Sequence, residues 1–84
     1  MADFIQIVVI DDNVRSLELL SAALDRDGIH VHTASSPEVG LELVRKLRPR
    51  LFMTDLVMPR LNLLDLLDPV MMTDPAIDCI LMTA

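Results

Sequence analysis

Four apolar runs, separated by segments of helical character, constrain the fold of this 84-residue chain more than any other feature. The runs are Ile5–Ile10, Ile29–Thr33, Leu51–Thr54 and 77–83. The first, third and fourth are almost continuously apolar, which is typical of strands covered by helices on both faces. The second run alternates His30 and His32 with apolar residues, which favours an edge strand with one wetter face.

Three segments between these runs carry apolar residues at helical spacing. They are residues 13–27, a second segment that begins at Ser36 and stops before Pro49, and residues 63–72. Asp12 or Asn13 can cap the first helix, and Gly28 suits its carboxyl-terminal stop. Pro69 falls inside the third segment, where its missing N–H predicts a kink. Strands and helices therefore alternate, which predicts an open parallel α/β sheet with right-handed crossovers.

Acidic side chains follow two of the predicted strands. Asp11 and Asp12 come directly after the first strand, and Asp55 comes directly after the third. If those strands are neighbours, the three carboxylates converge, and Mg²⁺ would relieve their mutual repulsion. A carboxylate beside bound Mg²⁺ can also attack phosphorus to form an aspartyl phosphate. Taken singly, Asp12 is more simply a helix cap and Asp55 is as well explained as a turn former.

Composition narrows the classes of function. Thirteen acidic residues against seven basic ones give a net charge of −6, so the chain is a poor candidate for nucleic-acid binding. No apolar stretch reaches the length of a membrane span, and the first ten residues lack the basic residues of a signal peptide. Cys79 is the only cysteine, so no internal disulfide can form. We therefore expect a cytoplasmic location.

Several segments, in the right order, resemble bacterial response-regulator receiver domains of two-component systems. Residues 7–13 are similar to the first strand and acidic pair of that family, and residues 51–59 are similar to its phosphoacceptor strand and loop. Residues 33–36 match the usual second strand and turn, and residues 80–84 look like the fourth strand with its switch Thr. The resemblance covers residues 1–84, and residues 58–72 look closest to the receivers of enhancer-binding transcription activators.

The resemblance implies a phosphoacceptor module of a phosphorelay rather than a turnover enzyme. Asp55 would accept a phosphoryl group from the phosphohistidine of a sensor histidine kinase. Thr83 would turn toward the phosphoryl oxygen, and Ala84 would leave room for it. The family's Mg²⁺ ligands would fall on Asp11 (largely through a bound water), Asp12, Asp55 and the backbone carbonyl of Val57.

The chain also departs from the family pattern. The family has a flavodoxin-like doubly wound sheet of five strands in the order 2-1-3-4-5, in which ligands bind at the switch point of the strand order. Here we expect four strands in the order 2-1-3-4 with three helices, because helix four, strand five and helix five are absent. The catalytic Lys of strand five is then missing, since Lys46 is the only Lys and falls on the second helix. We therefore expect impaired phosphorylation.

Two further expectations concern the fourth predicted strand and the loop that follows Pro59. The fourth strand would be an exposed apolar edge, which predicts a homo-oligomer or, as an alternative function, a non-phosphorylated structural and dimerisation fragment. Leu63 stands where the family usually has Gly, which predicts a reshaped loop after Pro59. An aspartyl-phosphate phosphohydrolase is disfavoured, because that class needs an acid at the position of Val57. His30 and His32 are only a weak metal pair.

Overall fold

The computed structural model describes residues 4–58 and 62–82, which form a four-stranded sheet with three helices. The elements are β1 (Ile5–Ile10), α1 (Val14–Leu24), β2 (Ile29–Ala34), α2 (Pro37–Leu47), β3 (Leu51–Asp55), α3 (Leu63–Thr73) and β4 (Asp78–Met82). All paired strands are parallel, in the order β2-β1-β3-β4. The predicted fold and strand order are confirmed, and β2 lies at an edge as its alternating pattern indicated.

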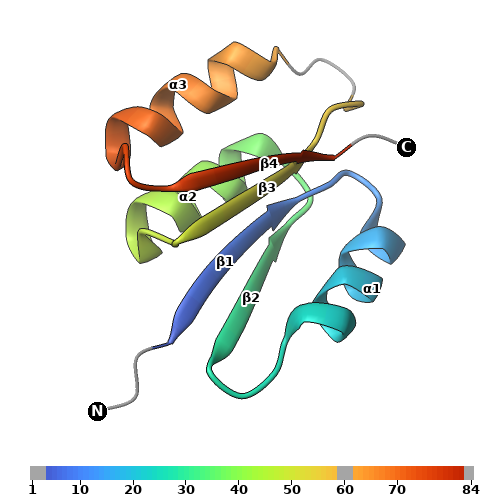
Figure 1. Ribbon diagram of the computed structural model, residues 1–84. Coiled ribbons are helices and arrows are strands. Elements are labelled where there is room, and N and C mark those ends of the chain that lie inside the picture. Colours follow the sequence, from blue (N-terminus) through green and yellow to red (C-terminus); the bar gives the residue numbers. More distant parts are fainter. Residues whose placement is uncertain (1–3, 59–61, 83–84) are drawn as a thin grey trace.

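Helices cover both faces of the sheet (Figure 1). α1 lies on one face, where Leu17 packs with Ile7 and Val9 of β1. α2 and α3 lie on the other, where Val44 and Leu66 join the larger core cluster. Because alternate residues of β1 point to opposite faces, β1 must be apolar at every position from Ile7 onward. No helix in the described ranges is both long and apolar enough to cross a membrane.

The larger cluster contains the centre of the hydrophobic core. Phe52 of β3 is fully buried there beside Val8 and Ile10. Gly40 of α2 lies directly over Ile10, and a Cβ at this position would overlap the isoleucine side chain. The glycine thus lets α2 approach the sheet closely, and a larger residue would force the helix away from β1.

The first two helices begin at the caps expected from the sequence, but α1 does not end at Gly28. Asn13 caps α1, and its side-chain oxygen accepts a hydrogen bond from the backbone N–H of Ser16. Gly28 is not the stop of this helix, because α1 already ends at Leu24 and Asp25 continues in extended conformation. Gly28 instead turns the chain into β2 with a φ of 83°. Ser36 caps α2 as predicted.

The third helix begins at Leu63 and runs through Pro69 to Thr73. Asn62 caps it by accepting a hydrogen bond from the N–H of Leu64. Leu63 does not have the positive φ that favours glycine, since Arg48 is the only non-glycine residue with positive φ in the described ranges, and the predicted reshaping of the loop after Pro59 falls on residues 59–61, outside those ranges. Leu63 instead supplies the first helical residue. The kink at Pro69 remains a prediction. At the end of the helix, the Thr73 hydroxyl donates a hydrogen bond to the Pro69 carbonyl.

Candidate functional site

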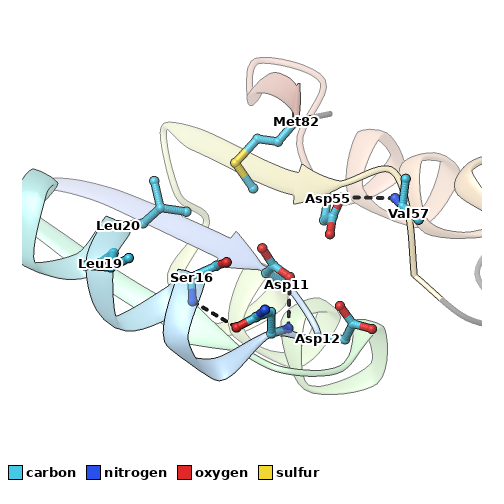
Figure 2. A pocket seen from close by; sticks show the side chains of 9 residues that line it. Asp11, Asp12, Ser16, Leu19, Leu20, Asp55, Val57 and Met82 are labelled. Atoms are coloured by element: carbon cyan, nitrogen blue, oxygen red, sulfur yellow. Dashed lines mark hydrogen bonds between the residues drawn. The ribbon is translucent and has the colours of Figure 1, made fainter. Parts of the chain in front are cut away.

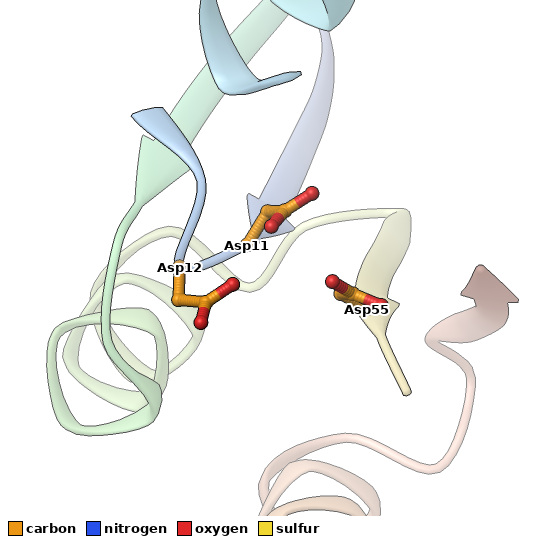
Figure 3. A group of neighbouring side chains, drawn as sticks. All are labelled: Asp11, Asp12 and Asp55. Carbon is orange, nitrogen blue, oxygen red and sulfur yellow. The ribbon is translucent and has the colours of Figure 1, made fainter. Parts of the chain in front are cut away.

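The carboxyl ends of β1 and β3 bring three carboxylates together, as the sequence predicted. Figure 3 shows Asp11 and Asp12 after β1 facing Asp55 at the end of β3. One carboxylate oxygen from each residue lies within 4.8 Å of the others. β1 and β3 are direct neighbours, while β2 follows β1 in the sequence and pairs on its other side. The cluster thus lies at the switch point of the sheet, where ligands of open α/β folds bind.

Backbone hydrogen bonds hold these acidic residues at the rim. The N–H of Asp11 donates to the carbonyl of Ala34, which extends the β1–β2 pairing by one step. On the other side, the N–H of Leu56 donates to the carbonyl of Met82 at 2.9 Å, which extends the β3–β4 pairing past Asp55. The positions of Asp11 and Asp55 therefore follow from the sheet itself.

Two of the carboxylates also fold back on the chain that follows them. The Asp11 Oδ1 accepts a hydrogen bond from the N–H of Asn13 at 2.9 Å. The Asp55 Oδ1 accepts one from the N–H of Val57 at 3.0 Å. Such turns are favoured by Asp, whose short side chain reaches a backbone donor two residues on. Both carboxylates are therefore oriented before any ligand arrives.

A cavity of about 540 Å³ opens in front of these carboxylates (Figure 2). Its lining mixes acidic, polar and apolar side chains: Asp11, Asp12, Asn13, Ser16, Leu19, Leu20, Asp55, Val57 and Met82. Sequence reasoning missed the walls made by Ser16, Leu19 and Leu20. Only the helical spacing of α1 from its cap at Asn13 could have indicated that these side chains reach the site.

The predicted site residues outside the three carboxylates have different outcomes. The side chain of Val57 is 70% exposed at the mouth of the cavity, which leaves its backbone accessible. Thr83 and Ala84 lie outside the described residues. Lys46 is exposed in the last turn of α2 and does not line the cavity. His30 stacks on Phe4, and His32 Nε2 lies 2.7 Å from the Gln6 side-chain oxygen, so neither histidine belongs to this site.

The electrostatics of the cluster depend most on Asp11, which is only 7% exposed. Burial raises the pKa of Asp11, and the negative charges of Asp55 and Asp12 raise it further. The hydrogen bond from the Asn13 N–H lowers it, but less than burial raises it. An ionised Asp11 is therefore costly until a positive charge enters the cluster.

The chemistry of these donors fits a hard divalent cation. Three carboxylates on one cavity supply oxygen ligands of the kind that Mg²⁺ prefers, and Mg²⁺ commonly binds through one or two carboxylates plus phosphate oxygens and water. A cation would also remove the repulsion that raises the pKa of Asp11. The three carboxylates thus have the ligand chemistry of a magnesium site.

The raised pKa of Asp11 makes the stability of the metal-free chain depend on pH. The folded state holds this proton more tightly than the unfolded state, so the stabilisation is complete below the ordinary pKa of Asp and is lost as pH rises through the raised value. In EDTA at pH 7 we expect Asp11→Asn to raise stability by about 1 kcal/mol. This corresponds to about 4–8 °C in Tm for a chain of this size.

Thermal unfolding followed by circular dichroism measures this effect. Asp27→Asn changes the same charge in an exposed turn far from the cavity and should leave Tm nearly unchanged. Adding Mg²⁺ should stabilise the wild-type chain and have little effect on Asp11→Asn. A lower Tm for Asp11→Asn in EDTA would show that the carboxylate is not under electrostatic strain.

An open parallel sheet with an acidic cavity at its switch point is typical of α/β modules that bind their ligands where the strands end. Comparison with known proteins makes this specific, because residues 7–84 match the response regulator receiver domain family. The chain belongs to this family and is a receiver domain of two-component systems. The resemblance seen in the sequence is thereby confirmed, while its finer placement among enhancer-binding activators remains a prediction.

Individual relatives agree with this assignment. The chain is 40% identical over 70 residues to a protein-glutamate methylesterase/protein-glutamine glutaminase of Anaeromyxobacter dehalogenans, covering 83% of the chain and 20% of that protein. It is 36% identical over 74 residues to the transcriptional regulatory protein AfsQ1 of Streptomyces coelicolor, covering 88% and 32%. The chain thus spans a fifth to a third of these curated relatives.

Solved structures show the same fold. A response regulator receiver domain protein from Clostridium thermocellum superposes with a TM-score of 0.85 and 32% identity, covering 95% of this chain and 65% of that one. A second receiver domain protein, from Methanospirillum hungatei, gives a TM-score of 0.87 at 22% identity, which supports the fold alone. The four strands and three helices described above therefore correspond to about two thirds of these solved chains.

Proposed function

We propose that Asp55 is the phosphoacceptor of this receiver domain and that a sensor histidine kinase supplies the phosphoryl group. The observation that carries the proposal is the convergence of Asp11, Asp12 and Asp55 on one cavity at the switch point of the sheet. Receiver domains accept phosphoryl groups from such kinases, and Asp55 is the acidic residue at the end of the strand that matches the family's phosphoacceptor strand.

In the proposed reaction an oxygen of the Asp55 carboxylate attacks phosphorus. A P–O bond forms to Asp55 while the P–N bond of the donor's phosphohistidine breaks, and the electron pair leaves with the imidazole. The hydrogen bond from the Val57 N–H holds the Asp55 carboxylate in a fixed rotamer during this attack. Leu20 and Met82 supply apolar surface beside the carboxylates in this cavity.

Asp11, Asp12 and Asp55, with the backbone carbonyl of Val57, would hold Mg²⁺. When bound, Mg²⁺ neutralises the charge of the carboxylates and of the phosphoryl oxygens. Thr83 and Ala84 keep the roles that the resemblance implies, contact with a phosphoryl oxygen and room for it, as predictions. Because no lysine lines the cavity in the described part of the chain, we expect slow phosphorylation.

Labelling with acetyl phosphate tests the proposal without a cognate kinase. The wild-type chain is incubated with acetyl phosphate and Mg²⁺, and its intact mass is measured over time. We expect one added phosphoryl group that hydroxylamine removes, as it removes acyl phosphates, and no addition in EDTA. A label that resists hydroxylamine, or one that forms equally in EDTA, would contradict the proposal.

A second candidate function rests on the β4 strand. In the described part of the chain β4 pairs on one side only, and Ile80 and Leu81 are 45% and 43% exposed. Such an apolar edge invites pairing with another chain, so the 84-residue chain is expected to form a homo-oligomer that could act without phosphorylation. Light scattering over a wide range of concentrations measures this, and a stable monomer at the highest concentration would rule it out.

A further inference from the structure

A basic cluster lies at the opposite end of the sheet from the three carboxylates. Four of the seven basic residues of the chain fall within six positions, at the end of α2 and the start of β3: Arg45, Lys46, Arg48 and Arg50. Since the net charge of the chain is −6, this concentration of positive charge is local. The basic side chains in the last turn of α2 interact favourably with the negative end of the helix dipole. Arg50 lies beyond the helix and has no such role.

Two of these arginines line a second cavity, of about 400 Å³. The cavity is formed by the start of β1, the α2–β3 connection and the α3–β4 connection: Phe4, Ile5, Gln6, Arg48, Pro49, Arg50, Asp74 and Ala76. Arg45 and Lys46 do not line it. The cavity therefore divides the basic cluster into a pair that faces it and a pair on the exposed surface of α2.

The backbone of Arg48 is held in an unusual conformation. It has a φ of 45°, in the left-handed region that Gly or Asn adopts most readily. Its N–H donates to the carbonyl of Val44 at 2.9 Å and closes the last turn of α2. An arginine thus occupies a position where glycine would cost less, and its side chain lines the cavity.

The backbone of Arg50 is fixed from both sides. Its N–H donates to the carbonyl of Gln6, and its carbonyl accepts from the N–H of Asp78, each at 3.0 Å. Between the two arginines, Pro49 is fully buried. The backbone that carries both arginines is therefore fixed, so a ligand would not have to order it on binding.

We propose that this cavity binds an acidic segment of a partner polypeptide in which a carboxylate side chain lies next to an apolar one. The planar guanidinium groups of Arg48 and Arg50 match carboxylates, and in the described part of the chain neither group forms an ion pair. Phe4 is half exposed beside them and offers apolar surface. Asp74 also lines the cavity, and its negative charge disfavours a doubly charged phosphate more than a singly charged carboxylate.

This binding site is separate from the proposed phosphoacceptor site. The cavity with Arg48 and Arg50 lies where the strands begin, whereas the cavity with Asp55 lies where they end, and the two share no lining residue. Only two arginines line the cavity, which suits a short acidic segment better than a nucleic acid, whose binding needs many phosphate contacts. Peptide binding therefore does not require phosphorylation, and each property can be tested without the other.

Fluorescence anisotropy tests the proposal with a fluorescein-labelled peptide in which glutamates alternate with leucines. Added to the wild-type chain, this peptide is expected to bind, and Arg48→Gln with Arg50→Gln should raise its Kd about tenfold. The control pair Arg45→Gln with Lys46→Gln removes the same charge outside the cavity and should change Kd by less than about twofold. Circular dichroism confirms that both variants are folded.

Three outcomes overturn the proposal. The first is an equal loss of binding in both double variants, which means that net charge alone attracts the peptide. The second is equal binding of a peptide in which lysines replace the glutamates. The third is displacement of the peptide by inorganic phosphate at matched ionic strength, which assigns the cavity to a phosphate group. A Kd that rises only in the Arg48 and Arg50 variant, without phosphate competition, supports the proposal.

Discussion

A chain carrying Asp55→Asn is expected to take up no phosphoryl group from acetyl phosphate. Asparagine has nearly the shape of aspartate, and its side-chain oxygen can still accept the hydrogen bond from the Val57 N–H that orients residue 55. The amide cannot attack phosphorus as the carboxylate does, so labelling should fall to background while the fold is retained. Intact-mass measurement in Mg²⁺ gives the labelling, and circular dichroism reports the fold.

Asp68→Asn provides the matched control for this variant. Asp68 is exposed on α3 and does not line the acidic cavity, so the same substitution there should leave the rate and extent of labelling unchanged. Labelling of Asp55→Asn at the wild-type rate would place the phosphoryl group on another residue. In that case the convergence of the three carboxylates would need an explanation other than phosphoryl acceptance.

The substitution Phe52→Ala is expected to remove a large part of the stability of the chain. Phe52 has no exposed surface and lies at the centre of the larger core cluster, between β1 and the helices α2 and α3. Replacing a buried Phe by Ala costs about 3–5 kcal/mol through lost burial and the cavity left behind. At about 0.05–0.15 kcal/mol per residue, a chain of this size has a total stability of about 4–13 kcal/mol, so this loss is a large fraction of it.

The second phenylalanine of the chain supplies the control. Phe4 is half exposed and stacks on His30 at a centroid distance of 4.3 Å, so Phe4→Ala should cost less than about 1 kcal/mol. Urea unfolding followed by circular dichroism measures both free energies. Similar losses for the two variants would mean that the core is not centred on Phe52.

Most of the fold could be predicted because buried parallel strands leave a clear record in the sequence. β1 matches its predicted bounds, and the other three strands differ from the predicted runs by a residue or two at their ends. Those ends depend on hydrogen bonds to neighbouring strands. The carbonyl of Met82, for example, continues the pairing of β3 and β4 by accepting from the N–H of Leu56. A single sequence contains no record of such pairing.

The end of α1 was predicted incorrectly for a local reason. A glycine after a helical pattern usually marks the stop, which led to Gly28. In the structure the chain leaves the helix at Asp25, and Arg26 then forms an isolated bridge with Ile29. Gly28 is needed for the positive φ of this tight turn into β2. Gly28 therefore does adopt a left-handed conformation, but it does so in the turn before β2 and not at the end of α1.

The acidic part of the site could be predicted, but its electrostatics and its walls could not. Adjacent strands one and three are sufficient to bring Asp11, Asp12 and Asp55 together, and the family resemblance, rather than the residue pattern, implied that these strands are neighbours. The burial of Asp11, which raises its pKa, depends on packing that only coordinates reveal. The left-handed Arg48 was equally hidden, because no residue type in its neighbourhood signals a positive φ.

The central position of β1 has a consequence for how the chain reaches its native state. β1 is synthesised before the other three strands, yet it pairs with β2 on one side and with β3, which ends at Asp55, on the other. Its apolar residues cannot be covered on both edges until more than half of the 84 residues have been synthesised. Nascent chains must therefore carry an uncovered, strongly aggregation-prone strand during translation, and parallel pairing across such sequence distances makes folding slow.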